Sequence, residues 1–178
     1  SFLAYISPPK DKVDCFDYPP EFFCTGAGAR IDCQRDGKCA AYAAAYLLRC
    51  FGEDADGGSL FPELKRPLGF VSANSIADVL AQHGYPAKAC RGSIDALKQR
   101  LAEGAPIIVF IRIPGDTHYA VAVGYDERHL YLADSLAENA NASDARYNRV
   151  LTTEAFEALW NTGALLPANI YIRAAIPA

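Results

Sequence analysis

A cysteine at the start of a helix-forming block is the residue best placed to do chemistry in this sequence. Cys39 opens an Ala-rich run that ends at Phe51. Unpaired backbone N–H groups and the dipole at a helix N-terminus favour a thiolate over a thiol, and a thiolate attacks acyl carbon atoms. The sequence therefore predicts Cys39 as a nucleophile, against the alternative that it is a buried core residue of the helix.

A thiolate nucleophile needs a base, and the chain has three histidines. His83 stands at a predicted helix end and His129 in a predicted turn, which are ordinary structural positions. His118 instead opens the predicted strand 119–125, where a rigid sheet can present it to a helix end. Asp134 closes the next strand, and a carboxylate there would orient the imidazole. We therefore expect His118 to be the base and acid, and Asp134 to hold its ring.

Attack on an acyl group creates an oxyanion, which needs hydrogen-bond donors. The side-chain amide of Gln34, five positions before Cys39, is the candidate donor beside the backbone N–H of Cys39. The predicted reaction is thiol acyl transfer to water. An acyl-enzyme forms on Cys39 while His118 protonates the leaving amine, and water then attacks with His118 as base. This chemistry requires no metal or organic cofactor.

Helices and strands must position these residues, and the sequence pattern changes from helical to strand-like along the chain. Helices are predicted first and strands later, which indicates the α+β class with antiparallel strands and no alternating β-α-β order. The region 53–70 reads as a loop. The predicted helices cover about 38–51, 75–83, 93–104 and 153–160, and the predicted strands cover 106–113, 119–125, 130–133 and 169–174.

The length of 178 residues predicts one domain, 1–178. Residues 1–35 hold Pro pairs and aromatic side chains without a sustained period, so we expect an ordered arm that wraps the body, with a short strand at 2–6. Cys15, Cys24 and Cys33 lie in this arm. Two of these three cysteines form one disulfide if the protein is exported, or all three stay free thiols.

Composition excludes several classes of partner. The net charge is -4, from 17 basic and 21 acidic residues without a run of either sign, so neither nucleic acid nor an anionic membrane is an expected partner. The longest uncharged stretch, 158–172, is too broken to span a bilayer. Because the chain begins at Ser1 without Met, we expect that a preceding segment was removed. An extracellular or cell-surface location is favoured over the cytoplasm, and the oligomeric state stays open.

The order of these residues resembles that of the papain-like cysteine peptidases. It is most similar to the bacterial branch typified by the double-glycine leader peptidases of bacteriocin exporters and their stand-alone relatives. The resemblance implies a helical part, led by the Cys39 helix, packed on an antiparallel sheet that bears His118 and Asp134. It also implies the four roles given above, Gln34 included, and a peptide or protein substrate. The segments that carry it are 32–52, 93–110, 118–126, 130–135 and 156–160.

Three positions depart from the family pattern. Ala40 replaces a Gly usual after the nucleophile, Ser135 replaces a Pro usual after the acid, and Gln34 is one residue nearer to Cys39 than is common. The 178 residues contain no transporter domains, so double-glycine specificity is not implied. Two alternatives stay open: an acyltransferase or non-peptide amidase of the same fold, and a non-catalytic binding domain.

Overall fold

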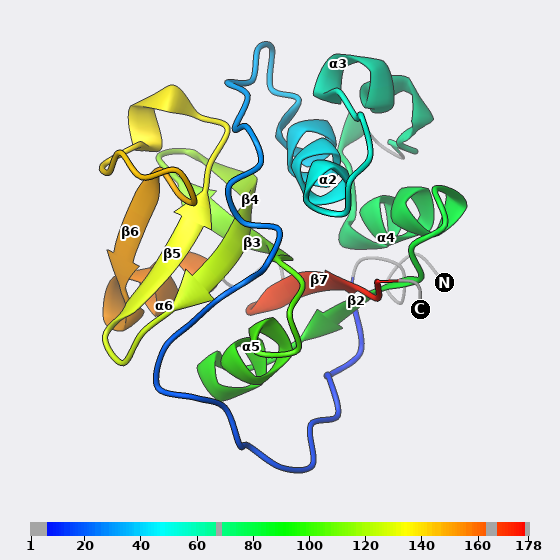
Figure 1. Cartoon of the computed structure of the whole chain (residues 1–178). Coiled ribbons are helices and arrows are strands. Elements are labelled where there is room, and N and C mark those ends of the chain that lie inside the picture. The colour runs from blue at the N-terminus through cyan, green and yellow to red at the C-terminus, as the bar shows by residue number, and fades with distance from the viewer. Residues whose placement is uncertain (1–6, 67–68, 163–166, 177–178) are drawn as a thin grey trace.

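The computed structural model describes residues 7–66, 69–162 and 167–176, and its centre is an antiparallel sheet (Figure 1). Six strands follow the order β2-β7-β3-β4-β5-β6, and the short β1 pairs with β4 outside this path. The strands are β1 (Phe22–Phe23), β2 (Ala87–Arg91), β3 (Ile107–Ile113), β4 (Asp116–Tyr125), β5 (His129–Ala133), β6 (Arg149–Thr152) and β7 (Ile170–Ala174).

Helices cover both faces of the sheet and form two cores. On one face α2 and α4 pack against the sheet, and on the other face α5 and α6 do so. The helices are α2 (Cys39–Cys50), α3 (Gly57–Leu60), α4 (Ala73–Gln82), α5 (Ile94–Leu101) and α6 (Thr153–Trp160), with short 3₁₀ turns at Phe61–Glu63 and Ala137–Asn139.

Helix α2 is the most deeply buried helix of the first face. Its run of alanines favours helix and lets the backbone approach the strands closely. Tyr46, Leu47 and Leu48 complete its buried surface near the C-terminal end. Cys39 is the first residue of α2 and only half-buried. The helix is thus anchored along its length while its first residue remains accessible.

Strands β4 and β5 form an antiparallel hairpin with a short turn. Tyr125 pairs with Leu130, and a bulge between Ala122 and Gly124 then shifts the pairing by one residue. The last pair before Asp134 joins Val121 to Ala133. His118, near the start of β4, therefore lies toward the hairpin end that Asp134 follows.

The N-terminal arm is tied to the body at several separate places. Its β1 lies beside the end of β4, where Phe23 pairs with Gly124. A Cβ atom at position 124 would stand 2.5 Å from the Phe23 ring, so glycine permits this approach. Tyr125 also donates its hydroxyl proton to the carbonyl of Pro19, at 2.8 Å.

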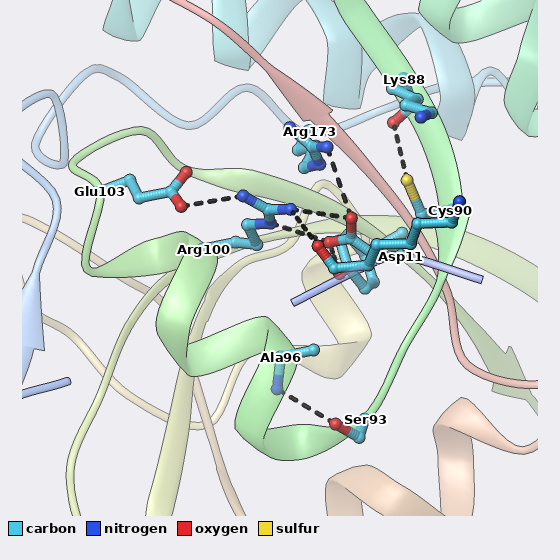
Figure 2. Close-up of polar contacts among 10 residues, drawn as sticks. Asp11, Lys88, Cys90, Ser93, Ala96, Arg100, Glu103 and Arg173 are labelled. Carbon is cyan, nitrogen blue, oxygen red and sulfur yellow. Dashed lines mark hydrogen bonds and ion pairs between the residues drawn. The ribbon is translucent and has the colours of Figure 1, made fainter. Parts of the chain in front are cut away.

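A buried carboxylate holds the first described part of the arm (Figure 2). Asp11 accepts two hydrogen bonds from Arg100 of α5, at 2.8 and 2.9 Å, and one from the Tyr171 hydroxyl of β7. Arg173 lies 3.4 Å from the same carboxylate. Burial alone would raise the pKa of Asp11, but these partners outweigh it and hold the pKa at about 2. The cluster of Asp11 with Arg100, Arg173 and Tyr171 therefore holds the arm against α5 and β7.

The predicted elements compare well with the structure. The four predicted helices and the strands near 107, 119, 130 and 170 are confirmed to within a few residues. The prediction of a loop over 53–70 was wrong in part, because Asp56 caps α3 by accepting a hydrogen bond from the Ser59 N–H. The edge strands β2 and β6 were not predicted, and the strand expected at 2–6 lies outside the described residues.

All six cysteines are free thiols, so no disulfide joins Cys15, Cys24 and Cys33. Cys24 is buried, whereas Cys15 and Cys33 are exposed. Within residues 7–66, 69–162 and 167–176, no helix combines the length and apolar character needed to cross a membrane.

Candidate active site

The structure brings His118 and Asp134 together as a buried pair. The Nε2 atom of His118 lies 2.7 Å from the Oδ1 atom of Asp134, and each residue is 1% exposed. Cys39 lies close enough to His118 to contribute to the raised pKa of its imidazole. Three residues far apart in the sequence, from α2, from β4 and from the segment after β5, thus form one chain of contacts.

The carboxylate of Asp134 is held by three further donors. The Leu136 N–H donates to Oδ1 at 2.9 Å, and the Asn139 amide donates to Oδ2 at 3.1 Å. Arg149, on the neighbouring strand β6, donates from Nη1 to Oδ2 at 3.1 Å. Together with His118, these groups surround both carboxylate oxygens, so the carboxylate has little freedom to rotate.

The backbone of Asp134 is fixed as well. Its N–H donates to Oδ1 of Asn148, and the Asn148 amide donates back to its carbonyl oxygen, each at 2.8 Å. This reciprocal pair holds the chain in place after β5 ends. Asp134 is therefore positioned by side chains as well as by the sheet.

These contacts set the charge states of the pair. Burial alone would lower the pKa of His118, but hydrogen bonds with Asp134 and Cys39 and the Asp134 charge outweigh it and raise the pKa to about 9. Burial opposes ionisation of Asp134, yet hydrogen bonding and the charge of His118 lower its pKa. Near neutral pH the pair is thus mostly an imidazolium and a carboxylate.

Gln34 is tied to the same region through its backbone. Its N–H donates to the carbonyl oxygen of Ser135 at 2.8 Å, which places Gln34 beside the residue that follows Asp134. The Oε1 atom of Gln34 is buried and has no hydrogen-bond partner among the described residues. The carboxamide oxygen therefore makes no hydrogen bond that holds the fold.

A cleft of about 400 Å³ opens at Cys39. A smaller, mostly apolar cavity of about 200 Å³ adjoins it and shares Phe70, Phe110, Thr117 and Tyr119 with it. Tyr119 donates its hydroxyl proton to the carbonyl of Val71 at 2.9 Å, which ties the cleft-lining backbone at Val71 to β4. The cleft is lined by Asp36, Gly37, Lys38, Cys39, Ala40, Phe61, Arg66, Gly69, Phe70, Val71, Phe110, Asp116, Thr117 and Tyr119.

The two other histidines have partners away from this cleft. His83 lies 2.9 Å from Glu63, and His129 lies 3.1 Å from Asp126 at the opposite end of the hairpin. Within the part of the chain that the structure describes, no group of His, Cys, Asp and Glu could hold a metal ion.

Sequence reasoning missed Asn139, Asn148 and Arg149. They lie within fifteen residues after Asp134, in a stretch without helical or strand periodicity. Polar residues clustered after a candidate acid were the available signal. It was weak, because loops are usually rich in such residues.

Comparisons with known proteins identify the family and the fold. Residues 29–164 match the model of the Peptidase_C39 like family. The peptidase domain of Streptococcus ComA, a bifunctional ABC transporter involved in quorum sensing, superposes with a TM-score of 0.68 at 16% identity, covering 84% of this chain and 99% of that one. A search of curated proteins gives no match.

Two further solved structures are similar. A C39-like peptidase from Bacillus anthracis has a TM-score of 0.66 at 16% identity and covers 86% of this chain and 96% of its own. A double-glycine-motif protease from an AMS/PCAT transporter, solved with its leader peptide, has a TM-score of 0.64 at 15% identity. The match covers 83% of this chain and 91% of that protease chain. With the family match over most of its length, the chain belongs to the Peptidase_C39 like family and is a cysteine peptidase of papain-like fold.

Proposed function

We propose that the protein hydrolyses peptide bonds with Cys39 as nucleophile, His118 as acid and base, and Asp134 as the group that orients His118. The observation that carries this proposal is the buried His118–Asp134 pair, with Cys39 close enough to influence the His118 pKa. Because Nε2 of His118 contacts Asp134, Nδ1 is the ring nitrogen left to exchange a proton with Cys39.

The charge state of His118 suits the first half of the reaction. With a pKa of about 9, the ring carries a proton near neutral pH that it can give to a leaving amine. The Cys39 sulfur attacks the carbonyl carbon and forms a tetrahedral oxyanion. The C–N bond then breaks as the amine takes the proton of His118, which leaves a thioester on Cys39.

Hydrolysis of the thioester reverses these roles. Neutral His118 takes a proton from water, and the resulting hydroxide oxygen attacks the acyl carbon. The second oxyanion collapses, the C–S bond breaks and the acid product leaves. Asp134 remains ionised throughout and keeps the ring in one tautomer and one orientation.

We assign oxyanion stabilisation to the Gln34 amide and the backbone N–H of Cys39. The side-chain NH₂ group of Gln34 is the donor that this role requires, and the Oε1 atom of the same carboxamide is buried without a hydrogen-bond partner among the described residues. Its backbone bond to Ser135 links the predicted donor to the chain segment that carries Asp134.

The substrate class that we propose is a peptide or protein. The cleft at Cys39 is open, joins an apolar cavity and carries charges of both signs, from Asp36, Asp116, Lys38 and Arg66. Such a lining suits a chain of mixed side chains. The similar AMS/PCAT protease was solved with a leader peptide, which supports a peptide as ligand here.

The test has two steps. A thiol-directed active-site probe should label Cys39 in the wild type and not in Cys39→Ala, with Cys50→Ala as the matched control that keeps labelling. A peptide library should then be cleaved by the wild type alone. Labelling with acyl transfer to an added amine, and no hydrolysis, would identify an acyltransferase instead. No selective labelling would identify a binding domain.

A further inference from the structure

We propose that Arg149 is a positioning residue that sets the proton affinity of His118 through the Asp134 carboxylate. This inference rests on the proposed function for its consequence, but its test does not require turnover. Arg149 begins β6, where it lies opposite Leu132 of β5, two residues before Asp134. The strand pairing therefore places the arginine beside the acid.

Each oxygen of the Asp134 carboxylate contacts a different cationic side chain. Oδ1 of Asp134 faces His118 at 2.7 Å, and Oδ2 faces Arg149 at 3.1 Å. The side chains of Asp134 and Arg149 are 0% and 12% exposed, so solvent screens this pair weakly. When the thiolate and imidazolium form, the charges alternate along the contacts from Cys39 to Arg149.

The alternation has a chemical consequence. A buried carboxylate with His118 as its only cationic partner would bind the imidazolium proton very tightly, and an imidazolium that holds its proton too tightly is a poor general acid. The Arg149 guanidinium lies against the Asp134 carboxylate whether His118 is charged or neutral, so it can offset the carboxylate charge in both states. It therefore lowers the proton affinity that Asp134 alone would give to His118.

The other charged groups around the pair are engaged elsewhere. Arg112 of β3 donates to the Ala158 carbonyl, and the Asp116 carboxylate accepts from the Thr117 N–H. From α2 and the residue before it, Arg49 donates to the carbonyls of Ala55 and Arg30 and pairs with Asp32, and Lys38 lies over the Phe61 ring. Among the described residues, Cys39, Asp134 and Arg149 are thus the ionic groups in this chain of contacts with His118.

The experiment is an NMR titration of the His118 imidazole, assigned with His118→Ala, in the wild type and in Arg149→Gln. Glutamine keeps a donor for Oδ2 but removes the charge. We expect the midpoint of His118, about 9 in the wild type, to rise by roughly one pH unit in Arg149→Gln. Circular dichroism verifies that each variant is folded.

Two controls make the result specific. Arg149→Lys keeps the charge and should leave the midpoint within a few tenths of a unit of the wild type. Arg128→Gln removes an exposed arginine at the opposite end of β5 and should not move it. An unchanged or lowered His118 midpoint in Arg149→Gln would overturn the inference. If Arg149→Gln does not fold, a shift of a full unit in the His118 midpoint of Arg149→Lys would overturn it.

This readout also separates the inference from the proposed function. If Arg149→Gln raises the His118 midpoint but the active-site probe does not label Cys39, the role of Arg149 stands and the peptidase mechanism fails. If Cys39 is labelled and the midpoint does not move, the mechanism stands and Arg149 is only a structural partner.

Discussion

Two buried carboxylates, Asp11 and Asp134, each bind arginine, yet their other partners differ. The Asp11 side chain is 2% exposed and contacts Arg100, Arg173 and Tyr171. The Asp134 side chain is 0% exposed and contacts Arg149, along with His118. In both cases the partners outweigh burial and lower the pKa of the carboxyl group.

The difference lies in which partners can lose a proton. Arginine remains charged at neutral pH, and the pKa of Tyr171 is raised by burial and by its hydrogen bond to Asp11, so the Asp11 cluster keeps one charge state. His118 has a pKa of about 9 and contacts a thiol beside an open cleft. A buried acid with fixed partners serves as an anchor, whereas the same acid with a titrating partner can take part in proton transfer.

The largest expected effect comes from removing the titrating partner. His118→Ala should lower kcat/KM by about 10⁴ or more, because both proton transfers lose their carrier. Steady-state assays on a peptide found by library cleavage measure this. Replacement of His83, which pairs with Glu63, is the matched control and should keep activity. Substantial activity in His118→Ala would remove the histidine from the mechanism.

The next effect concerns Asp134. Asp134→Ala should lower kcat by about 10²–10⁴, since the ring of His118 loses its orientation and its charge partner. Asp126→Ala should be nearly silent in kcat, because Asp126 binds His129 and Tyr131 at the far end of the hairpin. Thermal melts separate lost folding from lost chemistry. Full activity in Asp134→Ala would assign the orienting role to another residue.

A smaller effect is expected at Gln34. Gln34→Ala should lower kcat by about 10²–10³ and change KM little, since an oxyanion donor acts in the transition state. Gln34→Glu retains size but places an acceptor where a donor is needed, so it should be no better than alanine. A KM effect without a kcat effect would indicate substrate binding only.

Asp11 gives the smallest expected effect on turnover. Asp11→Asn should leave kcat within about twofold but reduce unfolding free energy by about 3 kcal/mol, because two arginines lose their buried partner. The stabilisation from Asp11 is present above its unfolded pKa near 4 and lost as pH falls toward 2. Urea melts at pH 7 and pH 3 measure it. Limited proteolysis should spare the wild-type arm and clip the variant faster.

This comparison also shows which features were readable in the sequence. The α2 helix, the β4–β5 hairpin and the spacing from His118 to Asp134 follow from local patterns of alanines and β-branched residues, and the structure has them. The Tyr125–Leu130 pairing was predictable because a short turn determines its register.

Contacts between residues far apart in the sequence could not be predicted from local sequence patterns. Nothing local to Asp11 indicates that Arg100 and Arg173 will surround it, and Arg149 is brought to Asp134 only by pairing of β5 with β6. The one-residue bulge near Gly124 was also not predicted, although a glycine inside a strand often marks a bulge. Such features depend on which strands become neighbours, and local propensity does not encode this.

We expect the proximity of His118 to make Cys39 the reactive thiol of this chain. Competitive alkylation near neutral pH, with mapping of all six cysteines, tests it without knowledge of a substrate. Burial raises the pKa of Cys24 to about 12 and of Cys50 to about 11, so these thiols should react slowly. Cys15 and Cys33 are exposed, so the alkylation rate of Cys39 is best compared with theirs. We predict that half-buried Cys39 is alkylated faster than either, and that His118→Ala removes this advantage; labelling of Cys39 at the same rate or more slowly would contradict the account.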